Sequence, residues 1–265
     1  MEGTDADDEL TADIARWAHD LNRLHALLDR LDKEAQHLIA QRSLFLTLND
    51  QAGDYPRSRG AWAFNLVVSN AVNAIILGLG RLWDQSPDAM SIPNAAKMLR
   101  EEGRSRLLVA EFIAGDRRIA ETTRYRHSDD PDEQAAWLAE RMRDALDAAA
   151  KGPATLLIHR EKLFTKIAAL LEEESTFHVK EARHTALAHA LEISREGKRR
   201  QEAGAEVRAP LIGEVIDLVD ETTGVVTELS LLARLVEPDY PTLRATWDDH
   251  VADLVARGLS YRSSA

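Results

Sequence analysis

Apolar residues in the first part of the chain recur in alternating steps of four and three. This spacing is typical of the seam of one long helix, here of about 35 residues. Asn49–Pro56 is rich in loop-forming residues and is expected to end it. The seam fits both pairing with a second copy and packing inside a bundle. It consists of Leu10, Ile14, Trp17, Leu21, Leu24, Leu28, Leu31, Ala35, Leu38 and Phe45, with Arg42 as an interruption.

A second helix is predicted over Ser58–Trp83, and its stretch Gly60–Gly80 carries no charged residue. Polar side chains at positions 65, 69, 70 and 73 are unfavourable in lipid. We therefore expect a helix surrounded by protein rather than a membrane span. Asn65, Ser69 and Asn73 recur every four residues, which predicts one polar seam with hydrogen bonds to a neighbouring helix.

The remaining segments also have helical period, and convincing alternating strands are absent. Asp130 followed by Pro131 predicts a capped helix start, and Gly152-Pro153 predicts the end of that helix. The pattern predicts a single all-α domain over residues 9–258, an elongated helical bundle, with 1–8 and 259–265 as disordered tails. The further helices are expected at 91–99, 104–126, 154–194, 211–236 and 240–257, with an exposed loop at 195–210.

Composition narrows the possible functions. The chain has no cysteine, which excludes disulfides, thiolate metal sites and cysteine nucleophiles. Its net charge of −12 disfavours nonspecific binding to a polyanion, although residues 97–127 form a locally basic stretch. Met1–Asp13 is acidic and lacks the order of a signal peptide, so a cytoplasmic location is expected.

One helical segment combines chemically useful residues. In the stretch from Lys180 to His189, Arg183 stands six positions before His189 among small apolar residues. A guanidinium can hold a phosphate through paired donors, and an imidazole can move a proton near neutral pH. On a regular helix the two side chains would point about 120° apart, so convergence needs long side chains or a helix break. The structural alternative is an arginine bonded to a carboxylate across the bundle and a buried histidine.

Three segments of the chain carry a resemblance to a known family. Residues 74–99 read AIILGLGRLWDQSPDAMSIPNAAKML, an apolar helix that ends in Arg81-Leu82-x-Asp84 and precedes a second helix. Residues 182–189 read ARHTALAH, an Arg-x(5)-His segment, and residues 209–235 hold a loop and a long helix. With the N-terminal helix they cover most of the chain, which resembles the AbiU-like abortive-infection proteins of the HEPN superfamily.

The resemblance implies a HEPN-like core and RNA cleavage without a metal or another cofactor. His189 would assist attack by the ribose 2′-hydroxyl or protonate the leaving oxygen, and Arg183 would stabilise charge on the phosphate. Lys180 and His184 are expected to contact the substrate. The resemblance also implies a homodimer and a role in phage defence or as a toxin with a cognate antitoxin. No attachment to a membrane is expected, because the polar side chains of the uncharged helix are unfavourable in lipid. Many family members carry an acid where this chain has His184, directly after the arginine.

Two other functions stay open. A noncatalytic bundle that binds a partner protein or a nucleotide would allow Arg183 and His189 to be buried or divergent. A di-metal bundle is the second, because two Glu-x-x-His pairs, Glu34/His37 and Glu181/His184, lie on predicted helices. Further carboxylate ligands for such a centre are not evident.

Arg30 and His37 form another arginine–histidine match, to which the sequence assigns no function. Asp84 is expected to act locally, as a cap or a partner of Arg81.

Overall fold

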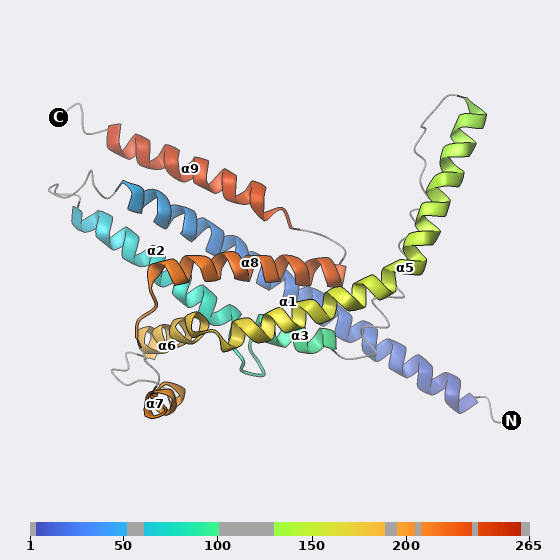
Figure 1. The fold of residues 1–265 in the computed structure, drawn as a ribbon, viewed down its shortest axis with the longest axis horizontal. Helices are drawn as coiled ribbons and strands as arrows, with labels where there is room; N and C mark the ends of the chain where they lie inside the picture. Colours follow the sequence, from blue (N-terminus) through green and yellow to red (C-terminus); the bar gives the residue numbers. More distant parts are fainter. Residues whose placement is uncertain are drawn as a thin grey trace.

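The structure is a computed structural model that describes residues 4–51, 61–100, 130–188, 195–204, 208–234 and 238–260. Within these ranges the chain forms eight helices and no strand, which confirms the predicted all-α class. Figure 1 labels them: α1 (Thr4–Asp50), α2 (Ala61–Leu82), α3 (Ile92–Arg100), α5 (Pro131–Glu172), α6 (Glu174–Ala188), α7 (Arg195–Glu202), α8 (Ile212–Arg234) and α9 (Tyr240–Ser260). Helix α1 thus begins inside the segment expected to be a tail.

Helix α1 is the central helix of the bundle and packs mainly on α2, α8 and α9. From Leu24 onward its predicted seam is buried, with Leu28 and Ala35 fully inaccessible to solvent. The alternating spacing therefore predicted the covered face correctly. The part of the seam from Leu24 to Phe45 packs within this chain, which excludes it as the contact surface of a second copy.

Arg42, which interrupts the seam, joins three helices. Its Nη2 lies 3.1 Å from Oδ2 of Asp220 on α8, and Arg244 Nη2 on α9 lies 2.7 Å from the other oxygen, Oδ1. A charge on the buried face of α1 is tolerated because it has this partner.

The end of α2 is part of the hydrophobic core. Trp83 is fully buried, and its indole N–H donates a 2.9 Å hydrogen bond to the hydroxyl of Thr222 on α8, which is also fully buried. Ile75 and Leu79 pack in the same cluster. This contact satisfies the one polar atom of the largest buried side chain and holds α2 against α8.

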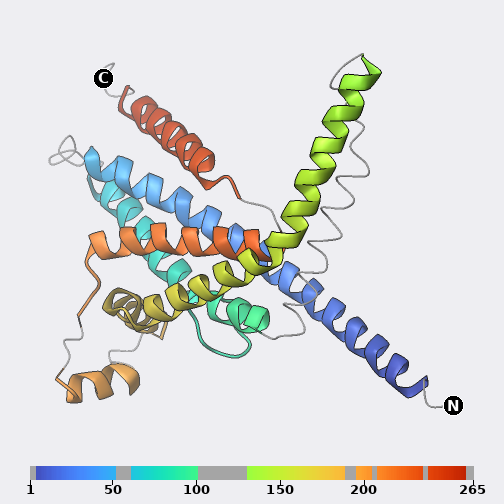
Figure 2. The same cartoon turned by 45° about the vertical axis from the view of Figure 1, so that its right-hand side comes forward.

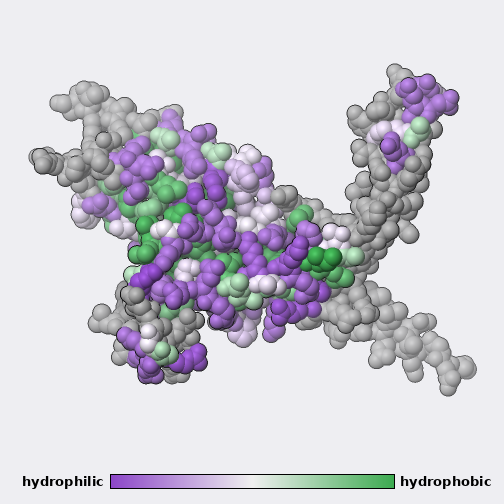
Figure 3. All heavy atoms as spheres, in the orientation of Figure 1, coloured by the Kyte–Doolittle hydropathy of each residue, from purple (hydrophilic) through white to green (hydrophobic). Residues whose placement is uncertain are grey.

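The prediction that α2 is surrounded by protein holds only for its second half. Trp62 is 76% exposed and Leu66 46%, and the predicted seam of Asn65, Ser69 and Asn73 also faces solvent. Helix α2 is the one helix in the described part of the chain with the length and composition to cross a membrane, and 28% of that stretch is buried. The apolar period and the composition identify the helix, but they do not show which half of it is covered by other helices. Figure 3 shows apolar side chains at the surface among a mostly hydrophilic exterior.

Helices α5 and α6 divide differently from the prediction. The Asp130 carboxylate caps α5 as expected and accepts a 2.9 Å hydrogen bond from the Asp132 N–H. Gly152-Pro153 does not end this helix, which continues to Glu172. Figures 1 and 2 show that α5 bends between its green and yellow parts, and an internal proline is a known cause of such a bend.

The true break comes at Glu173, whose extended backbone (φ −65°, ψ 142°) separates α5 from α6. The surrounding acidic run contains neither glycine nor proline, so the sequence carried no breaker signal there. The predicted loop at 195–210 contains the short helix α7, whereas α8 and α9 agree with prediction. The predicted helix 104–126, and with it most of the basic stretch, lies outside the described residues.

Candidate functional site

A groove of about 580 Å³ opens where α1, the end of α2, the following turn and α6 meet. Four basic side chains and two carboxylates line it, so the groove is positively charged within a molecule whose net charge is −12. Such a local excess of positive charge favours anionic ligands. The lining residues are Arg30, Lys33, Glu34, His37, Arg81, Asp84, Ala89, Met90 and Arg183.

One face of α1 forms a wall of this groove. Arg30, Lys33, Glu34 and His37 are spaced i, i+3, i+4 and i+7, which places them along one side of a helix. Their face is distinct from the buried seam that holds Leu31 and Leu38, so α1 is apolar toward the core and charged toward the groove.

Arg183 is fixed against the end of α2. Its Nη1 donates to the Gly80 carbonyl oxygen at 2.7 Å and to Asp84 Oδ2 at 2.9 Å. A Cβ at position 80 would lie 2.4 Å from Arg183 Cδ, so glycine is what allows this close approach. The side chain of Arg183 remains 27% exposed. The arginine predicted from the sequence therefore lies in the groove wall, with one nitrogen anchored.

Asp84 anchors this arginine and is itself held by the turn that follows α2. Its Oδ1 accepts hydrogen bonds from the Ser86 N–H at 2.9 Å and the Ser86 hydroxyl at 2.7 Å. Partial burial would raise the pKa of Asp84, but the bonds from Ser86 and Arg183 outweigh it and lower the pKa below its ordinary value. Asp84 stays ionised, and its role extends across the bundle rather than only to its own turn.

The other charged side chains of the groove are bound less firmly. Arg81 pairs with Glu34 at 2.9 Å, but both side chains are more than a third exposed, so the pair contributes little to stability. Arg30 points a guanidinium nitrogen at the Met90 sulfur, a weak acceptor. Lys33 has no hydrogen bond or ion pair within the described ranges. Arg30 and Lys33 are therefore cations that a ligand could engage without breaking an existing ion pair.

The structure describes two of the three remaining site residues that the sequence predicted. Lys180 is half-buried and His184 is exposed on α6, and neither lines the groove. Helix α6 is described as far as Ala188, so His189 lies just outside the described residues. Its predicted convergence with Arg183 stays a prediction.

The di-metal alternative gains no support from the described part of the chain. Glu34 is bonded to Arg81 instead of facing a second carboxylate, and Glu181 is buried on α6 while His184 faces solvent. No group of three or more histidine, aspartate or glutamate side chains in the described ranges could hold a metal ion.

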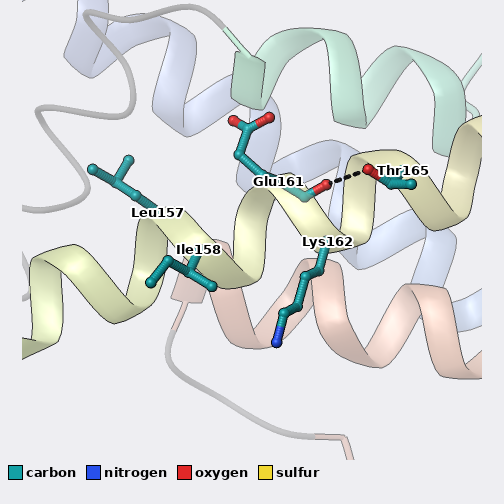
Figure 4. Close-up of a pocket in the computed structure, with 5 residues that line it drawn as sticks. All are labelled: Leu157, Ile158, Glu161, Lys162 and Thr165. Carbon is teal, nitrogen blue, oxygen red and sulfur yellow. Dashed lines mark hydrogen bonds between the residues drawn. The ribbon is translucent and has the colours of Figure 1, made fainter.

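A second hollow, of about 560 Å³, runs along α5, and Figure 4 shows the residues that line it. All five come from one helix, and Glu161 and Lys162 point in opposite directions. The hydrogen bond in that view, 2.9 Å from the Thr165 hydroxyl to the Glu161 carbonyl, lies within the helix. Without convergent polar groups this hollow has no ligand-binding constellation.

The all-α fold agrees with the class of protein that the sequence resembles. The family model of AbiU2, a HEPN family, matches residues 21–248. The chain belongs to this family and is a HEPN protein of the abortive-infection, or defence, type. No curated protein and no solved structure matches the chain.

Proposed function

We propose that this protein binds RNA in the groove and cleaves it without a metal ion. Arg183 holds the phosphate at the cleaved bond, and His189 moves a proton at the 2′ or the 5′ oxygen. Lys180 and His184, on the same helix as Arg183, contact neighbouring parts of the strand. The products are a 2′,3′-cyclic phosphate and a 5′-hydroxyl.

The hydrogen bonding of Arg183 carries this proposal. Both of its bonds come from Nη1, and Nη2 and Nε have no partner among the described residues. Those two nitrogens form one edge of the guanidinium fork, the geometry that binds two phosphate oxygens. Asp84 and Gly80 thus fix one nitrogen of the arginine and leave the other edge for a ligand.

The noncatalytic alternative is also favoured by a specific observation. The Arg183–Asp84 ion pair is the bond across the bundle expected of an arginine with a structural role. Under that alternative the bundle binds a partner protein or a nucleotide and catalyses no reaction.

Cleavage of labelled RNA by the purified protein in EDTA separates the two functions. We expect wild type to release cyclic-phosphate ends and His189→Ala to release none. Arg183→Lys keeps the charge but loses the fork, and cleavage should fall by about 100-fold or more, as for other lost transition-state donors. Thermal melting of each variant controls for folding. RNA binding by a wild type that cleaves nothing would support the binding module instead.

A further inference from the structure

His37 on α1 lies in the groove wall but belongs to none of the motifs that carry the family resemblance. Its side chain is exposed, and its Nε2 lies 3.5 Å from Gln41 Nε2, at the limit of a hydrogen bond. Within the described ranges it has no carboxylate partner. The imidazole is therefore accessible from the groove and is not held by a strong bond.

The other groups that line the groove are unsuited to moving a proton near neutral pH. Three of them are arginines, whose guanidinium groups do not act as bases in proteins, and Lys33 carries an ammonium group, which donates hydrogen bonds but accepts none. Glu34 on α1 is bonded to Arg81 of α2. Asp84 is occupied by Ser86 and by Arg183 of α6. His37 is the histidine among the described lining residues, and imidazole is the side chain most often used to transfer protons in enzymes.

The surroundings of His37 also suit a reaction at a phosphate. Lys33 stands one turn before it on α1, Arg30 two turns before it, and Arg183 lines the same groove from α6. A phosphodiester bound between α1 and α6 would therefore have cations on both sides and the imidazole beside it. The charge that develops on its oxygens would be stabilised by those cations.

We propose that His37 is a catalytic residue of the RNA cleavage, and this inference rests on the proposed function. Neutral His37 takes the proton of the ribose 2′-hydroxyl as the 2′ oxygen forms a bond to phosphorus. The bond between phosphorus and the 5′ oxygen breaks, and its electron pair stays on that oxygen. The 5′ oxygen then takes a proton from solvent. The strand leaves as a cyclic phosphate and a 5′-hydroxyl.

The test compares His37→Ala with His19→Ala, which removes an exposed histidine of the same helix outside the groove. Loss of a positioned base should lower kcat by about 10²- to 10⁴-fold. RNA affinity should change little, because the neutral imidazole contributes no charge. The rise of kcat/KM with pH that reports the base should disappear, and added imidazole should restore part of the rate. His19→Ala should behave as wild type.

The outcomes distinguish this inference from the function on which it rests. If wild type cleaves RNA and His37→Ala keeps both its rate and its pH profile, His37 is not catalytic and the proposed function stands. A loss of affinity with kcat unchanged would also overturn the inference, because it describes a binding residue. Absence of cleavage by wild type overturns both.

Discussion

At the scale of single residues, the unit that matters is Arg183 with Gly80 and Asp84. The guanidinium is held by one backbone carbonyl and one carboxylate, and the missing side chain at position 80 provides the space for its stem. Such anchoring fixes a long side chain before a ligand arrives, which lowers the entropic cost of binding. The position of the arginine is therefore set jointly by two residues more than 95 positions away in the chain.

Gly80→Ala should destabilise the protein and lower the affinity of the groove for RNA. The added methyl would lie 2.4 Å from Arg183 Cδ, so the arginine or the helix must move. Overpacking of this kind typically costs about 1–3 kcal/mol. Urea unfolding measures the free energy of unfolding, and fluorescence anisotropy with a labelled RNA measures the affinity.

Gly224→Ala is the matched control for that variant. It also replaces a glycine inside a helix, but the nearest atom to the new methyl is Lys166 Nζ at an ordinary 3.7 Å. It should stabilise by about 0.4–1 kcal/mol, because alanine loses less backbone freedom on folding. Equal effects of the two substitutions would mean that the close approach of Arg183 to Gly80 has no energetic weight.

The sequence identified Arg183 but missed most of the residues around it. Arg30 and His37 matched a motif that is common by chance, and nothing in the sequence assigned them a function. The i, i+3, i+4, i+7 spacing of Arg30, Lys33, Glu34 and His37 was a usable signal, since it predicts a shared helix face. Which helix this face meets depends on contacts between distant segments, and one sequence does not reveal those.

At the scale of helices, the apolar period and the capping residues predicted which segments are helical better than they predicted where each helix begins and ends. The buried seam of α1, the Asp130 cap and the extents of α8 and α9 all follow from local patterns. Gly152-Pro153 was wrong as a helix end because a proline removes one hydrogen bond, and a long helix can absorb that loss as a bend. The break at Glu173 has no glycine or proline beside it, and α6, which follows it, packs against the distant helix α2.

The start of α8 offers a pH test at this scale. Glu214 accepts bonds from Arg208 Nη1 at 3.0 Å and from the Leu211 N–H at 2.9 Å, just before the first helical residue. The bond with Arg208, followed by that from Leu211, lowers the pKa of Glu214 from 4.5 to about 2. A carboxylate with a depressed pKa in the folded state stabilises the fold above its unfolded pKa and loses that contribution as pH falls.

Glu214→Gln should therefore lower the melting temperature at pH 7. The gap to wild type should shrink as the pH falls from about 4.5 toward 2. Asp217→Asn is the control, since it removes the same charge from an exposed position of α8. A gap that keeps its size at pH 3 would contradict the assignment of the stabilisation to the Glu214 carboxylate.

At the scale of the whole molecule, an acidic protein carries a basic groove. The net charge of −12 opposes the approach of RNA at long range, while the side chains of the groove attract phosphates at short range. Under the proposed function, RNA binding should therefore depend on a few close contacts rather than on a broad basic surface.

This balance predicts a shallow dependence of RNA affinity on salt. If two or three phosphates are neutralised, log K should fall with log salt with a slope of about −1.4 to −2.1 for a single strand. Lys33→Ala should reduce that slope by about 0.7. Lys97→Ala, at an exposed position of α3 outside the groove, should leave it unchanged. Fluorescence anisotropy across a salt series gives both slopes, and equal slopes for the two variants would place the contact elsewhere.

The anchoring of Arg183 links ligand binding in the groove to the packing of α6 against α2. The same guanidinium ties α6 to the end of α2 through Nη1, lines the groove, and has no partner for Nε or Nη2 among the described residues. Any ligand held on that edge restrains α6 as well, so occupancy and helix docking are thermodynamically linked. The segment that directly follows α6 contains His189, and it is attached to the helix that such a ligand steadies. Under the proposed function, an RNA bound to Arg183 would thus restrain the helix that leads to the proposed acid–base residue.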